Sequence, residues 1–289
     1  MPELPEVETV RRILTQAAVG KRVAAIVSTR PKLVETVDNA HALDSLRGAR
    51  LLGVDRRAKW LTLRFDGDTQ AILHLRMTGQ IATVAPDGAR AVAGHPVPAF
   101  DAPLPATTTH LTITFDDGTL VYLQDPRHFA TLTLLPAALL ADYLQERDLG
   151  PEPLDADFTV EQFTARLASR SRAKLKPLLL DQSFVSGLGN IYADEALHLA
   201  RLHPERAPGS LSTDDIARLH HAMRAVLEEA IPIGGAKIER GKATPVNGFP
   251  RVHARQGEPC PTCGTPIVKY TLAGRGTYFC PHCQTKSPV

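Results

Sequence analysis

Long apolar segments are absent from this sequence of 289 residues, in which no uninterrupted run approaches the ~18 residues of a membrane-spanning helix. The N-terminus also lacks the basic and then apolar stretch of a secretory signal, and carries Glu3, Glu6 and Glu8 instead. These absences predict a protein with no membrane association, and we expect a cytoplasmic, nucleoid-associated location.

Strong compositional bias is absent as well. With 43% apolar and 22% charged residues, the sequence is close to the average of globular proteins, which excludes wholesale disorder, collagen-like repeats and coiled coils. Its length favours two domains, or two domains and a small appendage. The net charge is only +2, but residues 231–289 carry eight Lys and Arg against Glu239 and Glu258. This local excess of positive charge indicates an anionic partner.

Cysteine is scarce, and the four cysteines lie within the last 30 residues as two C-x-x-C pairs, Cys260 with Cys263 and Cys280 with Cys283. This spacing fits one tetrahedral Zn²⁺. Two disulfides or a redox pair are the alternatives, but a reducing compartment and the duplicated motif weigh against them. Four thiolates leave no open coordination position, so we expect a structural zinc. Strands at 267–270 and 277–279, joined by 272–276, would form a hairpin with Arg275 at its tip.

Periodicity divides the rest of the chain. Residues 4–18 have the apolar spacing of a helix. Short alternating runs over 22–84 and 109–135, with Asp-Gly turns, predict antiparallel strands in a sandwich. Residues 85–108 contain five prolines and predict a long flexible loop, which we interpret as an insertion.

The second half of the sequence has helical spacing. Apolar residues follow it from 160 to 227, and Ser212 begins a capping-box pattern before the last of these helices. The whole chain is thus expected to be a multidomain α+β protein. We predict a domain at 2–135, a linker at 136–155, a helical domain at 156–250 and a zinc hairpin at 251–289.

The N-terminus itself carries potential chemistry. Removal of Met1 would expose the secondary amine of Pro2, which at an α-amino pKa of ~7.7–8.0 is partly neutral near physiological pH. Such an amine can condense with an aldehyde carbon to form a cationic iminium, an electron sink. Glu3 and Glu6 could then handle protons. Taken alone, Glu6 and Glu8 would merely complement the helix dipole.

Several blocks of the sequence resemble the formamidopyrimidine-DNA glycosylase family, in the family's order and over nearly the whole chain. They are residues 1–12 (MPELPEVETVRR), 56–60 (RRAKW), 74–79 (HLRMTG), 125–129 (DPRHF), 150–153 (GPEP), 187–195 (GLGNIYADE) and the zinc hairpin with 273–276 (AGRG). The resemblance implies an N-terminal helix on a two-sheet antiparallel β-sandwich, a helix-two-turn-helix module and a zinc-ribbon hairpin. It agrees with the pattern read from the residues.

The resemblance also implies a function. It predicts a monomeric bifunctional DNA glycosylase and abasic-site lyase that acts on oxidised purines in double-stranded DNA without a required protein partner. Pro2 would be the nucleophile, assisted by Glu3, Glu6 and Lys59. Besides Lys59, the residues implied to contact DNA phosphates are His74, Asn190 and Arg275. An enzyme of this kind must flip the nucleotide out of the duplex, and the implied void-filling residues are Met77, Arg127 and Phe129.

Four features depart from the family's pattern. His128-Phe129-Ala130 stands where a basic residue, Phe and Gly are usual, and Thr107–His110 replaces a His-Asp-His entry to a strand. Residues 252–255 replace Val-Tyr-Gly-Arg, and the lesion-sensing region at 234–252 is several residues shorter. Two alternatives therefore stay open: an endonuclease VIII-like enzyme for oxidised pyrimidines or abasic sites, and a non-catalytic protein that binds damaged DNA.

Overall fold

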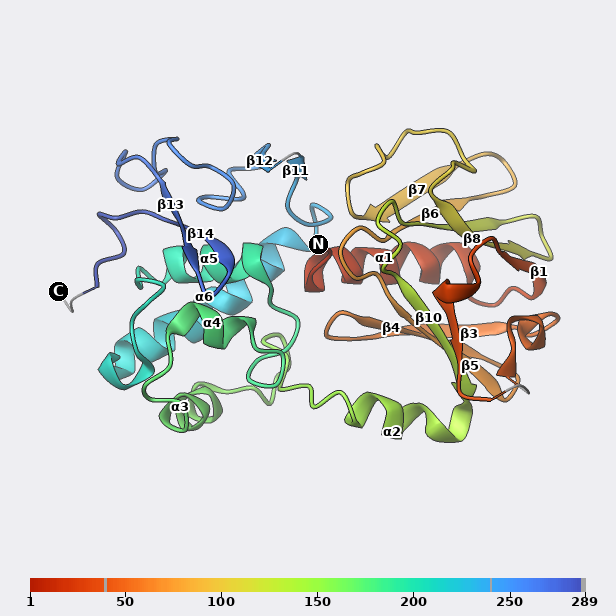
Figure 1. The fold of residues 1–289 in the computed structure, drawn as a ribbon, viewed down its shortest axis with the longest axis horizontal. Helices are drawn as coiled ribbons and strands as arrows, with labels where there is room; N and C mark the ends of the chain where they lie inside the picture. The colour runs from red at the N-terminus through yellow and green to blue at the C-terminus, as the bar shows by residue number, and fades with distance from the viewer. Residues whose placement is uncertain (39–40, 240, 287–289) are drawn as a thin grey trace. The chain divides into compact units, whose positions relative to one another are not determined.

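The computed structural model describes residues 1–38, 41–239 and 241–286. The chain forms two compact units, Met1–Arg147 (unit 1) and Asp148–Val289 (unit 2). Figure 1 shows the elements of each. Among the described residues, no helix combines the length and the apolar character needed to cross a bilayer.

Unit 1 begins with α1 (Leu4–Ala18), as the apolar spacing predicts. Pro5 stands in the first turn, where its missing N–H costs nothing, and Gly20 follows the helix with a φ of 90°. A glycine adopts this left-handed conformation without the steric penalty of other residues. The helix prediction is confirmed at both ends.

Two five-stranded sheets make up most of unit 1 (Figure 1). The first has the order β1-β8-β9-β6-β7, from β1 (Val23–Ser28), β6 (Gln80–Val84), β7 (Arg90–Gly94), β8 (Thr109–Phe115) and β9 (Leu120–Gln124). The second has the order β2-β10-β5-β4-β3, from β2 (Val34–Thr36), β3 (Leu51–Arg57), β4 (Trp60–Phe65), β5 (Thr69–His74) and β10 (Thr131–Pro136). All neighbours are antiparallel except β2 and β10, which pair in parallel.

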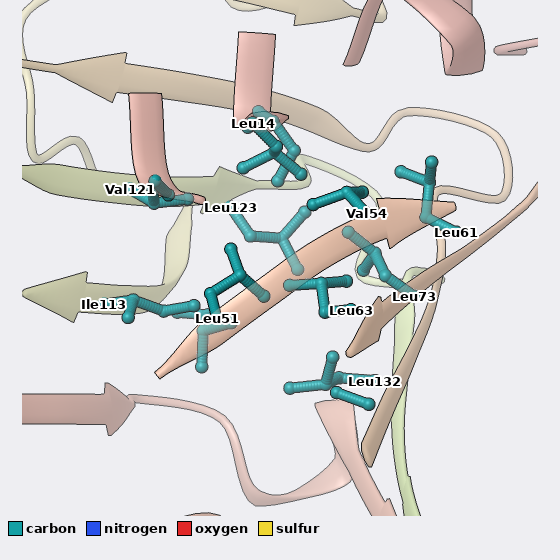
Figure 2. Close-up of a cluster of buried hydrophobic side chains, with 14 of the residues drawn as sticks. Leu14, Leu51, Val54, Leu61, Leu63, Leu73, Ile113, Val121, Leu123 and Leu132 are labelled. Atoms are coloured by element: carbon teal, nitrogen blue, oxygen red, sulfur yellow. The ribbon is translucent and has the colours of Figure 1, made fainter. Parts of the chain in front are cut away.

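The core of unit 1 is built from α1 and both sheets. Figure 2 shows Leu14 of α1 near Leu123 of the first sheet and Leu51 and Leu63 of the second. All four side chains are buried. Burying one leucine contributes about 1.5–3 kcal/mol, so this shared core holds both sheets and α1 together. The predicted sandwich with an N-terminal helix is confirmed.

The prediction of a long flexible loop at 85–108 is wrong in part. Arg90–Gly94 forms β7, which pairs with β6 along its full length. Beyond it, Gln80 Nε2 donates to the carbonyl oxygens of His95 and Pro98, at 2.7 and 2.8 Å. The prolines exclude long strands, but hydrogen bonds from a buried glutamine hold the segment in place.

The last element of unit 1 is α2 (Leu140–Gln145). Unit 2, which follows it, is mainly helical. The helices and strands of unit 2 are α3 (Val160–Ala168), α4 (Leu175–Leu180), α5 (Asn190–Leu199), α6 (Thr213–Ala230), β11 (Ile238–Glu239), β12 (Lys242–Ala243), β13 (Val268–Leu272) and β14 (Arg275–Phe279). The predicted capping box begins α6, because Ser212 Oγ accepts a hydrogen bond from Asp215 N at 3.1 Å.

Candidate active site and DNA-binding residues

The residues that follow Met1 are buried within unit 1. Pro2 is buried, and Glu3 and Glu6 are 1% and 5% exposed. Glu6 Oε2 accepts the Glu3 backbone N–H at 2.8 Å, so the Glu6 carboxylate caps α1 and orients the residue that follows Pro2. Glu6 is thus placed to position the N-terminus.

Glu8 has a different role. Its carboxylate pairs with Arg11 and Arg12 on α1 and with Arg56 on β3. Burial raises the pKa of Glu8, but the hydrogen bonds from Arg11 and Arg12 outweigh this and lower it to about 2. Glu8 is therefore ionised near neutral pH and serves as a structural anion, as its place in the helix suggests.

Lys59 lies in the tight turn between β3 and β4, where Ala58 adopts a φ of 53°. The turn is anchored to α1, because Arg56 donates from one guanidinium nitrogen to the Ala58 carbonyl at 3.1 Å and from Nε to Glu8 at 3.2 Å. The structure thus links Lys59 to the first helix through two neighbouring residues.

His74 ends β5 as a neutral imidazole. Burial, followed by the positive charges of Arg76 and Lys59, lowers its pKa to about 3. Its Nδ1 accepts the Arg76 N–H at 2.9 Å, so the ring proton is on Nε2. The ring also packs edge-on against Trp60, with centroids 4.4 Å apart. His74 therefore offers one uncharged N–H donor in a fixed orientation, which suits a phosphate oxygen.

The three predicted void-filling side chains project from two segments of unit 1. Met77 and Phe129 are 37% and 48% exposed although both are large and apolar. The Arg127 guanidinium lies over the Phe129 ring, 4.9 Å from its centroid. Exposure of this kind is unusual for side chains that serve only the core, and it fits residues that contact a partner.

In unit 2, Asn190 and Arg275 are joined through Gly276. Asn190 Nδ2 donates to the Gly276 carbonyl at 2.9 Å, and Arg275 is exposed beside it in the chain. The N-cap of α5 is Gly189 and Asn190 is the first helical residue. One detail differs from expectation. The β13–β14 turn has two residues, Ala273 and Gly274, both with positive φ, so Arg275 begins β14.

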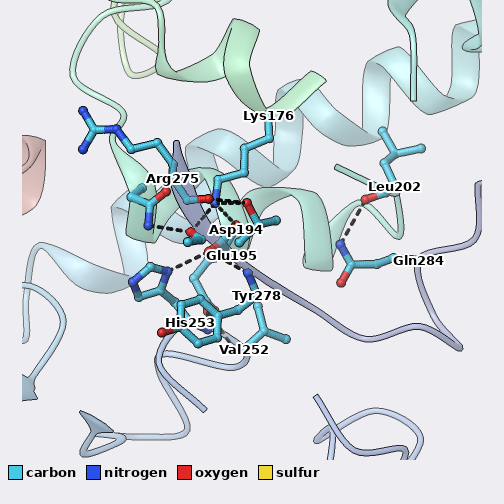
Figure 3. A network of polar contacts seen from close by, with 12 residues as sticks. Lys176, Asp194, Glu195, Leu202, Val252, His253, Arg275, Tyr278 and Gln284 are labelled. Atoms are coloured by element: carbon cyan, nitrogen blue, oxygen red, sulfur yellow. Dashed lines mark hydrogen bonds and ion pairs between the residues drawn. The ribbon is translucent and has the colours of Figure 1, made fainter. Parts of the chain in front are cut away.

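A buried ion pair beneath this hairpin was not predicted from the sequence. Figure 3 shows Lys176 of α4 reaching Asp194 of α5, with Nζ 2.7 Å from Oδ1. Lys176 Nζ also donates to Gly276 O and Thr277 Oγ1, at 2.8 and 2.9 Å. The other Asp194 oxygen accepts from Tyr278 N at 3.2 Å. The signal was visible, because a lysine stands in the run Leu-Lys-Pro-Leu-Leu-Leu and two acids follow one another in an apolar helix.

Other cations of the 166–176 run also have structural partners. Arg166 donates to the carbonyls of Ser183 and Phe184, and Lys174 pairs with Glu205. Five cations without an acid, as at residues 166–176, can indicate a surface that faces phosphate, but Arg166 and Lys176 are engaged within the protein. Local charge counts do not distinguish a solvated face from carbonyl-capping cations.

The departures in sequence have structural consequences in unit 2. His253, which stands at the family's usual Tyr position, places Nδ1 2.7 Å from Asp194 Oδ2. Next to Asp194, Glu195 accepts the backbone N–H groups of Arg251, Val252 and His253. Burial raises the pKa of Glu195, against the effect of these hydrogen bonds. Residues 251–253 are thus held directly on α5.

The four cysteine sulfurs form the expected metal site. The Sγ atoms of Cys260, Cys263, Cys280 and Cys283 all lie within 4.8 Å of one another, close enough to converge on one Zn²⁺. His198 Nε2 lies 3.4 Å from Cys260 Sγ. Burial, followed by the charge of Arg251, lowers the pKa of His198 to about 4, so a neutral imidazole contacts the Cys260 sulfur. The donor set fits one structural zinc.

Comparison with known proteins identifies the family. A formamidopyrimidine-DNA glycosylase from Heliobacterium modesticaldum is 40% identical over 98% of this chain and 100% of its own length. The chain belongs to the formamidopyrimidine-DNA glycosylase family. Family models for the glycosylase's N-terminal domain, its helix-two-turn-helix (H2TH) domain and the zinc finger found in FPG and IleRS match residues 1–132, 149–241 and 257–286. The glycosylase from Herpetosiphon aurantiacus is 41% identical over 98% of the chain.

Solved structures of formamidopyrimidine-DNA glycosylases share this fold. The Lactococcus lactis Fpg in complex with DNA containing an abasic site superimposes with a TM-score of 0.84, at 38% identity over 99% of this chain and 100% of that one. MutM in complex with DNA containing carbocyclic 8-oxo-G has a TM-score of 0.82, at 38% identity over the same coverage. These similarities establish a base-excision-repair glycosylase of the Fpg type and confirm the predicted fold class.

Proposed function

We propose that this family member is a bifunctional glycosylase and abasic-site lyase that excises oxidised purines, such as 8-oxoguanine and formamidopyrimidines, from double-stranded DNA. The observation that supports this most directly is the N-terminus, where Pro2 is followed by buried Glu3 and by Glu6, which caps α1. The DNA in the related complexes carries an 8-oxoguanine analogue, a formamidopyrimidine or an abasic site, which supports the substrate class.

In the proposed mechanism, loss of Met1 exposes the Pro2 amine. The neutral amine attacks C1′ of the flipped nucleotide, the bond from C1′ to the base breaks, and the departing base takes up the proton that the amine loses. Glu3 then protonates the sugar ring oxygen, and the bond from C1′ to that oxygen breaks as the nitrogen lone pair forms the iminium. The resulting iminium has no N–H proton to lose and stays cationic. It acidifies the C2′ proton, whose removal expels the 3′ phosphate by β-elimination, and the 5′ phosphate follows by δ-elimination.

The remaining site residues have binding roles in this proposal. Lys59, which also assists the catalytic residues, and His74 in unit 1 contact phosphates of the damaged strand, and so do Asn190 and Arg275 in unit 2. Phe129 wedges between bases, Met77 occupies the vacated stack and Arg127 contacts the base left unpaired. We further propose that the protein acts as a cytoplasmic, nucleoid-associated monomer, with domains at 2–135, 156–250 and 251–289. The boundary between the two compact units, after Arg147, lies within the proposed linker at 136–155, and the separate family models for 149–241 and 257–286 support a division of unit 2.

Borohydride trapping tests the proposal. Duplexes with 8-oxoguanine or an abasic site should cross-link to the protein, and Pro2→Gly or retention of Met1 should sharply reduce the cross-link while duplex affinity stays largely intact. A preference for thymine glycol would instead favour the endonuclease VIII-like enzyme. Absence of cross-linking to all three substrates would indicate the non-catalytic binding protein.

Glu3→Gln separates the two chemical steps. Removal of a general acid costs about 100-fold or more, so base excision should slow by this factor while strand cleavage at a preformed abasic site changes much less. Equal loss of both steps would contradict the role of Glu3.

A further inference from the structure

Asp125 connects the two segments that carry the void-filling residues. Its carboxylate is 1% exposed, and Oδ2 accepts the backbone N–H groups of Phe129 and Ala130, each at 2.6 Å. Oδ1 accepts the Arg127 N–H at 3.2 Å and the Thr78 hydroxyl. One buried carboxylate therefore holds the backbone of residues 127–130 and the residue that follows Met77 in the chain.

Each segment is also constrained by itself. In the Met77 turn (residues 75–79), Arg76 has a φ of 52° and Gly79 N donates to Leu75 O at 2.9 Å. A Cβ on Gly79 would lie 2.5 Å from that same oxygen, so this turn requires glycine. In the wedge loop (residues 125–130), His128 has a φ of 64° and its N–H donates to Asp125 O at 3.1 Å. Two preformed turns thus meet at one carboxylate.

The substitution at Ala130 fits this arrangement. The family's usual Gly would allow a left-handed backbone, but Ala130 has a negative φ, is buried, and donates its N–H to Asp125. No flexibility is needed at this position, and a side chain here restricts the unfolded loop.

We propose that Asp125 and Thr78 are positioning residues that couple the Met77 turn to the wedge loop, so that Met77, Arg127 and Phe129 enter the duplex together. The inference rests on the proposed function of these three side chains. When the base stack opens around Phe129, a shift of the wedge loop moves Asp125, which binds the N–H groups of Phe129 and Ala130. The hydrogen bond from Thr78 to Asp125 then moves the adjacent Met77 as well. Such preorganisation lowers the entropy lost when the site assembles on DNA.

Thr78→Val tests the coupling, because it removes the bridging hydroxyl and leaves the side-chain volume almost unchanged. Thr78→Ser keeps the hydroxyl. Thr83→Val is the matched control, since Thr83 is buried on β6 and its hydroxyl points to Ala91 O at 3.4 Å. Three measurements are made on each: single-turnover excision from an 8-oxoguanine duplex, fluorescence of 2-aminopurine beside the lesion, and borohydride trapping on a single-stranded abasic oligonucleotide, which has no stack to open.

The Thr78→Val variant loses a hydrogen bond to the buried Asp125 carboxylate. It should therefore excise the base from the duplex about tenfold more slowly than the parent and give a smaller 2-aminopurine signal. Trapping on the single strand should be unchanged, Thr78→Ser should retain the parent rate, and Thr83→Val should match the parent. If Thr78→Val slows single-strand trapping equally, Thr78 supports unit 1 as a whole and the proposal is wrong.

A double variant isolates positioning from general stability. In a Met77→Ala background, Thr78→Val should have little further effect on duplex excision, because the side chain that it positions is gone. Additive losses would overturn the proposal. If Met77→Ala and Phe129→Ala both leave duplex excision unchanged, the assigned void-filling roles fail instead, which distinguishes that outcome from failure of the coupling.

Discussion

Two buried aspartates, one in each unit, organise the segments expected to contact DNA, and they do so by different means. Asp125 in unit 1 is bound by three backbone N–H groups and a hydroxyl, all of them neutral. Asp194 in unit 2 is paired with the Lys176 ammonium, 2.7 Å away, and contacts His253. Both carboxylates are at most 1% exposed.

The difference follows from what each aspartate must hold. Asp125 lies in the loop that it organises, so the amides of residues two to five positions later are within reach. Asp194 ties α5 to α4 and to β14, which lie 18 and 84 residues away in the chain. A long lysine can span such elements, but the desolvated pair makes each member dependent on the other. Asp125 uses neutral partners mainly within its own loop and reaches the Met77 turn through the Thr78 hydroxyl, whereas Asp194 needs a buried ammonium to join two helices, at a higher risk.

The largest effect should come from unit 2's zinc site. Cys260→Ser, or chelation of the metal, should unfold residues 260–283, because the free energy of metal binding at such sites is also folding free energy. DNA affinity should fall at least about 100-fold as the contacts of Arg275 and Asn190 are lost, at about 1.5 kcal/mol or more each. Metal analysis and binding to an abasic-site duplex measure this. Unit 1 should stay folded, and a loss of its β-sandwich signal would contradict separate cores.

Next in size is Lys176→Met, which leaves the Asp194 charge buried without its ammonium partner. Unit 2 should lose about 3–5 kcal/mol of stability, measured by chemical denaturation. Adding Asp194→Asn should recover part of this loss, since the uncompensated charge is removed. If Lys176→Met alone is neutral, the ion pair does not hold α4, α5 and β14 together.

The stability of unit 1 should instead depend on pH because of His74. The pKa of His74 in the folded protein is about 3, below the ~6.5 of an unfolded chain. The unfolded state therefore binds more protons between these values, and stability should fall by up to ~1.4 kcal/mol per unit as the pH drops through this window.

The single tryptophan reports this transition. Trp60 lies 4.4 Å from the His74 ring, so its fluorescence follows denaturation of unit 1. His74→Gln should flatten the pH dependence, whereas His221→Gln, at an exposed position on α6, should leave it unchanged. An equal slope in the parent and His74→Gln would show that His74 is not held neutral.

The smallest structural effect is expected for Arg275→Ala. Zinc content and stability should stay at parent values, because Arg275 is exposed. Affinity should weaken, and the slope of log affinity against log salt should flatten by ~0.9 for one lost phosphate contact. Lys269→Ala on the neighbouring strand is the control, since its ammonium lies over the Tyr278 ring. Unchanged binding by Arg275→Ala across a salt series would make the hairpin a stability module.

Local features of the chain were predictable. The α1 boundaries follow from apolar spacing and from Pro5 and Gly20, and the turn at Asp117-Gly118 joins two antiparallel strands as its residues suggest. The C-x-x-C pairs predicted four converging sulfurs. These signals lie within a few residues of one another, so short-range geometry determines them.

Features that depend on a distant partner were not predictable. Residues 90–94 become a strand because β6 supplies hydrogen bonds, not because their own sequence requires it. Lys176 stands in an apolar run, which marks it as unusual, but the sequence does not identify the aspartate on another helix against which it is completely buried.

The helix at the N-terminus, the sandwich and the zinc ligands follow from the amino-acid sequence alone, and its resemblance to a family predicts the residues of the candidate site. The folded chain was needed to see which cations are structural, and that Asp125 and Thr78 bring the Met77 turn to the wedge loop. The reason is physical. Periodicity and spacing express the geometry of one segment, whereas burial and ion pairing depend on which other segment desolvates the group and offers it a partner.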